Sequence, residues 1–459
     1  MLRICISLLA LAAAGARAET VDAIWSARYV VTEDASHTLI ENGAVAVRGE
    51  RIVAVGTGAE IGRKYTAGRH LDRPQAILIP GLINTHTHAA MSLMRGIADD
   101  MRLQEWLRGY IFPAEAKNVS PDYVYWGTKL ACLEMMLSGT TTFVDMYFFE
   151  ERAAEAAKEA GLRGVLGETV IGFPSPDAKT PAEALRYAED YIAKYKDDAL
   201  IVPAVAPHAL YTNSPETLRA ARALANRYGV PLVIHVSETK RENDETQAKY
   251  GLSPARYLDS IGVWNGRSVA AHGVWLDEAD MAVLQARGVG VAHCPSSNMK
   301  LASGIAPVAR MLARGMIVGL GTDGPAGSNN DFDLMEEMNL AADLQKVATG
   351  DPRVLPAQQA LDMATILGAR AIGMEKEIGS IEAGKRADMA TIRIDRPHAV
   401  PMYNVYSQIV YALKGSDVED TMVNGVALVE NGRPVRMDAE AVMAKAREYQ
   451  ARVAASLKK

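Results

Sequence analysis

Apolar runs that alternate with helical stretches are the feature of this sequence that most restricts its fold. Eight such runs lie at residues 76–82, 140–144, 164–169, 200–206, 231–236, 268–271, 288–292 and 317–321. Strands separated by helical crossovers pair in parallel, and eight strand–helix units over about 300 residues match a TIM barrel. The alternative is a doubly wound open sheet, but no glycine-rich phosphate loop opens the series. We therefore expect an α/β fold, a (β/α)8 TIM barrel.

Two hairpin patterns lie near opposite ends of the chain. Strand-like runs at 44–47 and 51–55 flank Gly49, and a second pair of runs flanks Asn424 and Gly425. An Asn-Gly pair between apolar runs is a strong signal for a tight hairpin turn. We expect one small composite β-sandwich domain that is assembled from both chain ends.

These patterns divide the chain into four parts. They are a signal peptide at 1–18, the composite β-sandwich domain at 19–75 and 376–435, the barrel at 76–375, and a C-terminal helix at 436–459.

The first residues have the pattern of a cleaved leader. Arg3 precedes an apolar run at 4–14, and small residues at 16 and 18 form a cleavage site before Glu19. The run is too short to span a bilayer, and no cysteine follows it at the cleavage point to carry a lipid anchor. We expect a periplasmic or secreted protein with no membrane partner. A mis-chosen start or a buried N-terminal helix would instead leave the protein in the cytoplasm.

Charge and cysteine content restrict the partners. The 55 acidic residues outnumber the 49 Lys and Arg residues, giving a formal net charge of -6. Nucleic-acid binding draws on an excess of basic residues, so we expect a small-molecule ligand and no nucleic acid. After loss of Cys5 with the leader, Cys132 and Cys294 remain. They could form one disulfide, and we expect neither to be a nucleophile. The sequence leaves the oligomeric state open, a homo-oligomer included.

Titratable side chains gather at the expected carboxyl ends of the strands, which is where TIM barrels have their active sites. Six of the nine histidines fall there, together with one Glu and one Asp: His86, His88, His208, His235, Glu238, His272, His293 and Asp323.

Four of these residues form a candidate metal set. His86 and His88 can reach one ion because alternate residues of an extended segment point the same way. The pair alone is weak, since satisfied histidines are commoner than ligands. With His235 and Asp323 it becomes a set of three nitrogens and one oxygen that suits Zn²⁺ or Fe²⁺ and leaves a position for water.

A metal ion at such a site would lower the pKa of a water molecule and supply hydroxide at neutral pH. Hydroxide attack needs a base, an orienting group and an acid. We predict Asp323 as the base, His272 as the group that holds and polarises the hydroxide, and Glu238 as the acid that protonates a ring nitrogen of the substrate. These roles predict a metal-dependent hydrolase that acts on an N-heterocycle.

Several motifs accompany these residues. They occupy residues 80–88, 94–96, 138–141, 206–208, 234–239, 271–273, 295–301, 321–324 and 379–388. Together they resemble the amidohydrolase superfamily, and more narrowly the 5-methylthioadenosine/S-adenosylhomocysteine deaminases and the triazine hydrolases. The resemblance runs over residues 22–430.

The resemblance implies one divalent ion, Zn²⁺ first, with Fe²⁺ or Mn²⁺ as alternatives. Members with two ions use a lysine on the fourth strand, and residues 200–208 contain none. It also implies deamination of an adenosine-type nucleoside, with Glu115 contacting the ribose hydroxyls and His208 contacting the substrate. Hydrolysis of a triazine, a guanine-like or pterin-like base, or a cyclic amide is the alternative.

The sequence departs from the resemblance near the end of the third strand. Glu168 stands where members that accept S-adenosylhomocysteine have an arginine for the substrate carboxylate. A glutamate there would repel this carboxylate. We therefore expect adenosine or 5-methylthioadenosine to be preferred. A second departure, at 326–328, follows the eighth strand at the expected pocket rim.

Overall fold

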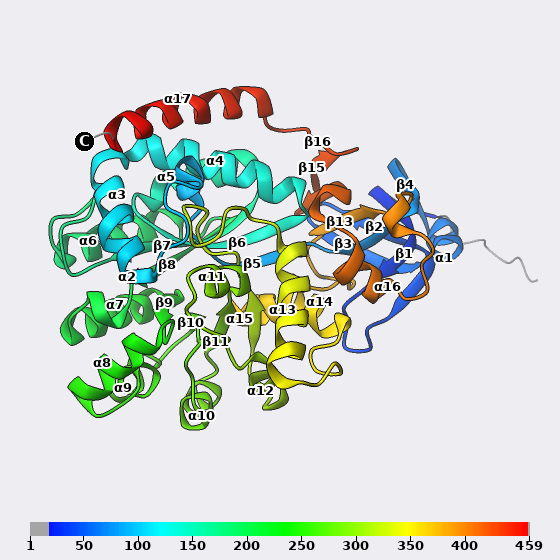
Figure 1. Cartoon of the computed structure of the whole chain (residues 1–459). Coiled ribbons are helices and arrows are strands. Elements are labelled where there is room, and N and C mark those ends of the chain that lie inside the picture. The colour runs from blue at the N-terminus through cyan, green and yellow to red at the C-terminus, as the bar shows by residue number, and fades with distance from the viewer. Residues whose placement is uncertain (1–17, 458–459) are drawn as a thin grey trace, which may run out of the picture.

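The computed structural model describes residues 18–457, which form a nearly closed parallel barrel and a second sheet beside it (Figure 1). The barrel strands, in spatial and sequence order, are β5 (Leu82–Thr87), β6 (Thr140–Tyr147), β7 (Arg163–Val170), β8 (Ile201–Pro207), β9 (Leu232–Val236), β10 (Ser268–His272), β11 (Gly290–His293) and β12 (Val318–Leu320). A parallel bridge between Thr87 and Asp323 joins the first strand to the residues after the last. The predicted TIM barrel is confirmed.

The prediction for the first barrel strand is wrong. Residues 76–80 belong to β4 (Tyr65–Pro80) of the second sheet, and the chain enters the barrel only at Leu82. The change of sheet occurs at Gly81, where a Cβ atom would lie 2.2 Å from the Thr141 side chain. The sequence shows one apolar run across this point because both strands are buried.

Helices surround the barrel, and local sequence explains where many of them start and end. Thr180 and Ser214 accept backbone N–H groups in the first turns of α6 and α7, and each is followed by a proline. Both residue types favour a helix start. Gly229, at φ 68°, ends α7 in the left-handed conformation that glycine adopts without strain.

The helices that surround the barrel are η1 (Ala89–Met94), α2 (Leu103–Trp106), η2 (Leu107–Ile111), α3 (Phe112–Asn118), α4 (Pro121–Leu137), α5 (Glu150–Ala160), α6 (Pro181–Tyr195), η3 (Leu210–Thr212), α7 (Pro215–Tyr228), α8 (Lys240–Tyr250), α9 (Pro254–Ser260), α10 (Glu278–Ala286), α11 (Pro295–Lys300), α12 (Val308–Ala313), α13 (Leu334–Thr349), α14 (Ala357–Ala364) and α15 (Ile366–Ala371). The remaining helices are α1 (Gly58–Lys64), η4 (Pro397–Ala399), α16 (Val405–Ser407), η5 (Gln408–Ala412), η6 (Gly415–Asp417) and α17 (Ala439–Leu457).

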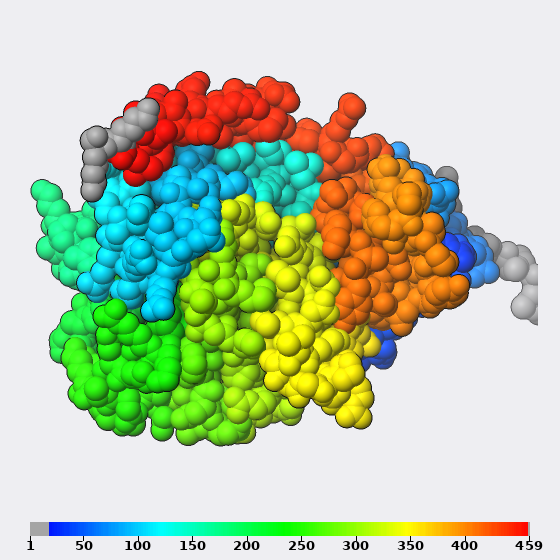
Figure 2. All heavy atoms as spheres, in the orientation of Figure 1, coloured from blue at the N-terminus to red at the C-terminus, as the bar shows by residue number. Residues whose placement is uncertain are grey.

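The second sheet draws its strands from both chain ends, as predicted. Its order is β16 (Arg433–Pro434), β15 (Val426–Glu430), β14 (Val418–Val423), β13 (Met389–Arg393), β4, β1 (Glu19–Val31), β2 (Leu39–Arg48) and β3 (Arg51–Thr57). Both predicted hairpins are present, as β2–β3 and β14–β15. The strands form one continuous hydrogen-bonded sheet that encloses its own apolar core around Trp25, Ile52, Leu78 and Met422. Figure 2 shows this part as a separate lobe at one side of the barrel.

The predicted C-terminal helix is α17, which lies across α3 and α4 (Figures 1 and 2). The rings of Tyr449 and Tyr123 meet edge to face, 5.6 Å apart, and Asn118 Nδ2 donates to Ser456 Oγ at 2.8 Å. These contacts hold the C-terminal helix against α3 and α4.

Three further expectations concern the chain as a whole. Residues 1–17 of the predicted leader at 1–18 lie outside the described residues, and export stays a prediction. Within residues 18–457, no helix combines the length and the apolar character needed to cross a membrane. Cys132 and Cys294 are both buried and free, so the disulfide that the sequence allowed is not formed.

Candidate active site

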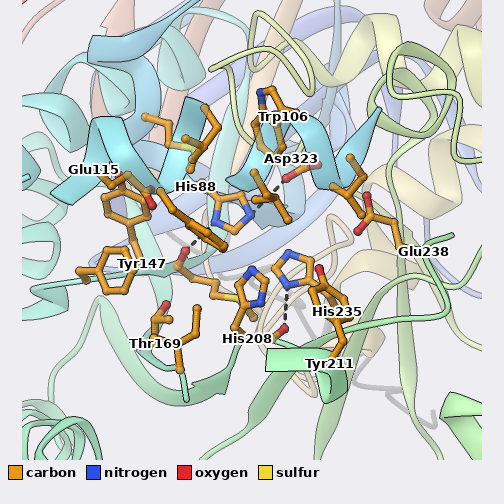
Figure 3. Close-up of a pocket in the computed structure, with 18 of the residues that line it drawn as sticks. His88, Trp106, Glu115, Tyr147, Thr169, His208, Tyr211, His235, Glu238 and Asp323 are labelled. Atoms are coloured by element: carbon orange, nitrogen blue, oxygen red, sulfur yellow. Dashed lines mark hydrogen bonds and ion pairs between the residues drawn. The ribbon is translucent and has the colours of Figure 1, made fainter. Parts of the chain in front are cut away.

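The four predicted metal ligands meet at the carboxyl ends of the barrel strands. His86 lies in β5, His88 follows it, His235 lies in β9, and Asp323 follows β12. All four are buried, and their candidate ligand atoms lie within 4.8 Å of one another. Asp323 Oδ1 is 3.2 Å from His88 Nε2 and 3.5 Å from His86 Nε2. Figure 3 shows His88, His235 and Asp323 facing one another.

Hydrogen bonds behind the cluster orient two of its imidazoles. The Nδ1 atom of His88 is 2.7 Å from Met146 O, and the Nδ1 atom of His235 is 2.8 Å from His208 O. A ring that donates Nδ1–H to a carbonyl keeps its Nε2 lone pair free for a metal.

His86 gives the most direct indication that the cluster holds an ion. Its side chain is fully buried, and neither ring nitrogen has a hydrogen-bond partner within residues 18–457. Burial lowers the pKa of His86 to about 4, so the imidazole is neutral and its lone pair is available. A buried polar group without a partner is costly, and a divalent ion would satisfy it. Three imidazoles and one carboxylate therefore fit a divalent metal.

Asp323 is held as an ionised carboxylate. Its Oδ2 accepts from Ser297 Oγ at 2.6 Å and its Oδ1 accepts from the Gly324 amide at 2.8 Å. Although burial alone would raise it, the pKa of Asp323 is well below its usual value because the imidazoles of His86 and His88 lie close to the carboxylate.

Three residues at the same face of the barrel have a strained backbone. Ser237, His272 and Asp323 have φ values of 52°, 72° and 63°, a region that favours glycine. His272 ends β10, Ser237 follows β9, and Asp323 lies three residues beyond β12, so strained residues lie at or just beyond the ends of three barrel strands. Such strain is typical of sites where function requires a fixed side-chain direction.

Glu238 and His272 lie beside the metal cluster. His272 Nδ1 is 3.0 Å from Asn298 Oδ1, and its Nε2 is 3.9 Å from Glu238 Oε2. Burial and the nearby Asp323 carboxylate raise the pKa of Glu238 well above its usual value. Both effects favour the protonated form of Glu238, which the role of an acid requires.

A pocket opens onto the cluster (Figure 3). It contains seven of the eight predicted site residues: His88, Glu115, His208, His235, Glu238, His272 and Asp323. His86 is fully buried and does not line the pocket. Glu115 and Glu238 occupy opposite sides of the pocket in Figure 3.

The two residues assigned to substrate contact by resemblance both reach this pocket. Glu115 projects from α3, and burial raises the pKa of its carboxyl to about 7. His208 follows β8, with its Nδ1 atom 3.1 Å from Thr212 Oγ1. Burial lowers the pKa of His208 to about 3, so its ring is neutral. The structure places both side chains for contact, while their roles stay predictions.

The sequence reasoning missed most of the pocket wall. Twelve further side chains contribute: Met91, Leu103, Trp106, Leu107, Ile111, Phe112, Met146, Tyr147, Phe148, Thr169, Ile171 and Tyr211. Many of these side chains come from the segment 103–112. Its apolar and aromatic content was the one sequence feature that could have identified it as part of the pocket wall. Trp106 Nε1 donates to Ala326 O at 2.9 Å, so the departure at 326–328 supports the pocket wall.

Two buried polar residues that support the ligands were also missed. Asp145, in β6, accepts from Thr87 Oγ1 at 2.8 Å and from the Ala89 amide at 2.7 Å, which fixes the residues on either side of His88. Asn84 Nδ2 donates to Thr322 Oγ1 at 2.8 Å, which ties β5 to the residue before Asp323. Both lie in strands that the sequence identified, but nothing in their spacing marked them.

One predicted placement is wrong. Glu168 is fully buried outside the pocket, and its Oε2 accepts from the Glu150 amide at 2.9 Å. Successive strand residues face opposite sides, and it is Thr169 that lines the pocket. Glu168 therefore does not meet the substrate there. His293 lies at the end of β11, as expected, but it is buried and does not line the pocket.

Comparison with known protein families settles the family of the chain. Residues 77–428 match the Amidohydrolase family. The chain belongs to this family. Residues 43–67 of this amidohydrolase, in its second sheet, also match an imidazolonepropionase-like composite domain of bacteria. The resemblance stated from the motifs is confirmed.

Curated relatives of this amidohydrolase match over most of its length. A 5-methylthioadenosine/S-adenosylhomocysteine deaminase of Thermodesulfovibrio yellowstonii is 49% identical over 422 residues, covering 92% of this chain and 96% of the relative. A protein of Syntrophus aciditrophicus named 5-methylthioadenosine/S-adenosylhomocysteine deaminase 1 is 47% identical over 440 residues, covering 96% and 99%.

Solved structures agree with this placement. A zinc-bound adenosine deaminase of Xanthomonas campestris superposes with a TM-score of 0.94 at 38% identity, covering 96% of this chain and 100% of that one. A zinc complex of an atrazine chlorohydrolase of Arthrobacter aurescens superposes with a TM-score of 0.85 at 26% identity, covering 93% and 100%.

Proposed function

We propose that this amidohydrolase hydrolytically deaminates an adenosine-type nucleoside, releasing ammonia and the oxo product. The observation that carries the proposal is a single pocket whose lining includes both an acid and a base. Protonated Glu238 and ionised Asp323 both line it, beside a cluster that fits a divalent ion. Two carboxyl groups held in opposite protonation states allow acid and base roles at one pH.

The side chains divide the reaction between them. When bound, a divalent ion makes a water molecule acidic enough to supply hydroxide at neutral pH. Asp323, as a carboxylate, accepts the proton of the attacking water. Glu238 donates its proton to the ring nitrogen beside the amine-bearing carbon, which makes that carbon more electrophilic. His272, fixed by Asn298, orients the attacking oxygen. Asp323 passes the proton that it accepted to the amino group, which leaves as ammonia, and the remaining proton of the attacking oxygen restores Glu238.

The relatives support the nucleoside and the metal of this proposal. Those described above are named as deaminases of 5-methylthioadenosine and S-adenosylhomocysteine, and the Xanthomonas structure is an adenosine deaminase with bound zinc. We assign Zn²⁺ to the site on that ground and on its nitrogen-rich ligand set. Export to the periplasm is a separate proposal that rests on residues 1–18 alone.

The pocket wall predicts a preference among nucleosides. No Lys or Arg is among the described residues that line it, and the wall is largely apolar. The neutral methylthio group of 5-methylthioadenosine would be buried there at little cost, whereas the charged end of S-adenosylhomocysteine would lose water without gaining a partner. We expect kcat/KM for adenosine and 5-methylthioadenosine to exceed that for S-adenosylhomocysteine by about 10-fold or more.

Steady-state rates on the three nucleosides test this preference. Equal or faster turnover of S-adenosylhomocysteine would contradict it and would direct attention to Arg108. That residue is exposed on η2, just outside the lining, where its Nε donates to Gln104 Oε1 at 3.1 Å.

Glu115 provides a test of ribose recognition. Replacing it with Gln keeps the shape of the side chain but removes the charge that strengthens a hydrogen bond to a hydroxyl. We expect Glu115→Gln to lower kcat/KM for adenosine by about 10-fold. The loss should be much smaller for 2′,3′-dideoxyadenosine, which lacks the hydroxyls.

Glu105→Gln is the matched control, since Glu105 is exposed in the same helical segment and does not line the pocket. This variant should behave as the unmodified enzyme on both substrates. If Glu115→Gln lowered kcat/KM equally for adenosine and the dideoxy compound, Glu115 would not bind the ribose hydroxyls.

A further inference from the structure

A second group of potential metal ligands lies at the junction of the two sheets. Glu33 and His37 belong to the loop between β1 and β2, and Asp362 belongs to α14 on the barrel. Their candidate ligand atoms lie within 4.8 Å of one another. His37 Nε2 is 2.8 Å from Asp362 Oδ1. None of the three lines the substrate pocket.

Glu33 is the residue that points to a ligand. Its side chain is only 1% exposed, and neither carboxylate oxygen has a hydrogen-bond partner among the residues that the structure describes. The Asp362 carboxylate beside it adds like charge. A buried carboxylate without a partner is costly, and a second carboxylate next to it increases the cost unless a cation or a proton lies between them.

The loop that carries two of the three side chains is well held. The Thr32 amide donates to Thr38 O at 3.1 Å, and the His37 amide donates to Asp34 O at 2.9 Å. On the other side, Tyr406 Oη donates to His37 O at 3.4 Å. Asp34 is engaged by its own loop, because it accepts from the Ser36 and Thr38 amides. The positions of Glu33 and His37 are therefore fixed before any ligand binds.

We propose that Glu33, His37 and Asp362 form a second divalent-cation site, which fastens the β1–β2 loop to the barrel. One imidazole and two carboxylates are donors that Zn²⁺ and Mn²⁺ accept, with water completing the coordination. The side chains of His37 and Asp362 are 32% and 16% exposed, so an ion and its waters can reach the site. The ion has a structural role here and takes no part in deamination.

A shared proton is the competing occupant. Burial and the Asp362 carboxylate raise the pKa of Glu33 to about 9, and a proton between the two carboxylates would relieve their repulsion without any ion. The two occupants differ in what they predict for metal stoichiometry.

Equilibrium dialysis against Zn²⁺ distinguishes them. The chelator-stripped full chain is dialysed at neutral pH and bound zinc is measured by mass spectrometry, in parallel for the unmodified protein and three variants. The variants are Glu33→Gln, His37→Gln, and a double variant of the active-site cluster, His86→Asn with His88→Asn. The unmodified chain should bind two ions. Glu33→Gln and His37→Gln should each bind one and keep their deaminase activity, and the double variant should bind one without activity.

Thermal unfolding of the double variant adds a readout that is independent of catalysis. Zn²⁺ should raise its unfolding midpoint, because the remaining site joins the two sheets, and adding Glu33→Gln should abolish this shift. A single ion in the unmodified chain, or an unchanged stoichiometry in both Glu33→Gln and His37→Gln, would overturn the proposal and leave the shared proton. His37→Gln keeps the test decisive if Glu33→Gln does not fold, since His37 is partly exposed.

Discussion

Replacing Asp323 with Asn should abolish deamination. The amide still offers an oxygen to the metal cluster but has no second basic oxygen to accept the proton of the attacking water. Loss of a positioned base costs about 100- to 10,000-fold in rate. Because Asp323 is also one of the four candidate ligands, we expect the upper end of that range in kcat. The measurement is ammonia release by Asp323→Asn protein whose metal content has been determined.

The metal content makes this result interpretable. A loaded but inactive variant supports Asp323 as the base, and an inactive variant that regains activity when excess Zn²⁺ restores its ion assigns Asp323 to metal binding alone. Near-normal activity in metal-loaded Asp323→Asn protein would refute the mechanism.

Replacing Glu238 with Gln should lower kcat by about 100- to 10,000-fold while leaving the active-site ion in place. Glutamine has nearly the same shape but cannot give up a proton to the ring nitrogen. Burial and Asp323 raise the pKa of Glu238, so the acid form persists at neutral pH and the rate should fall as pH rises through that pKa. The residual activity of Glu238→Gln should lack this alkaline decline. Rate–pH profiles of both proteins measure it.

Glu242→Gln is the matched control for this change. Glu242 is also buried and lies four residues further along, where its Oε2 accepts from the Glu238 amide at 2.9 Å, but it does not line the pocket. A glutamine oxygen can still accept that bond, so activity should be largely kept. Loss of the ion in Glu238→Gln would show that Glu238 has been misassigned and is a ligand.

The barrel could be predicted because its signal is repeated and local. Seven of the eight expected runs coincide with barrel strands, since buried parallel strands read as short apolar runs between helices. The first run failed at Gly81, where a buried strand of one sheet passes into a buried strand of the other. Apolar content is the same on both sides of this point, and the contact with Thr141 that requires a glycine exists only in three dimensions.

The metal-binding part of the site could be predicted because its side chains are of uncommon residue types that lie at strand ends. His86, His88, His235 and Asp323 could be grouped because parallel strands bring their carboxyl ends to one face. The pocket wall could not be found in this way, because Trp106 and Phe112 are ordinary apolar residues until the chain folds over the barrel. Glu168 shows what the sequence could not predict within a strand. The sequence identified β7 as a strand but did not show which of its two faces meets the pocket.

Ammonia release in isotopically labelled water tests the central claim most directly. Protein with a measured zinc content is incubated in ¹⁸O-water with adenosine, 5-methylthioadenosine, S-adenosylhomocysteine, guanine, a pterin and an aminotriazine. We predict one ammonia per turnover from adenosine and 5-methylthioadenosine, a single ¹⁸O atom at the former amine-bearing carbon, and loss of the reaction when a chelator removes the ion. No ammonia from either nucleoside, with turnover of guanine, the pterin or the triazine instead, would contradict the account.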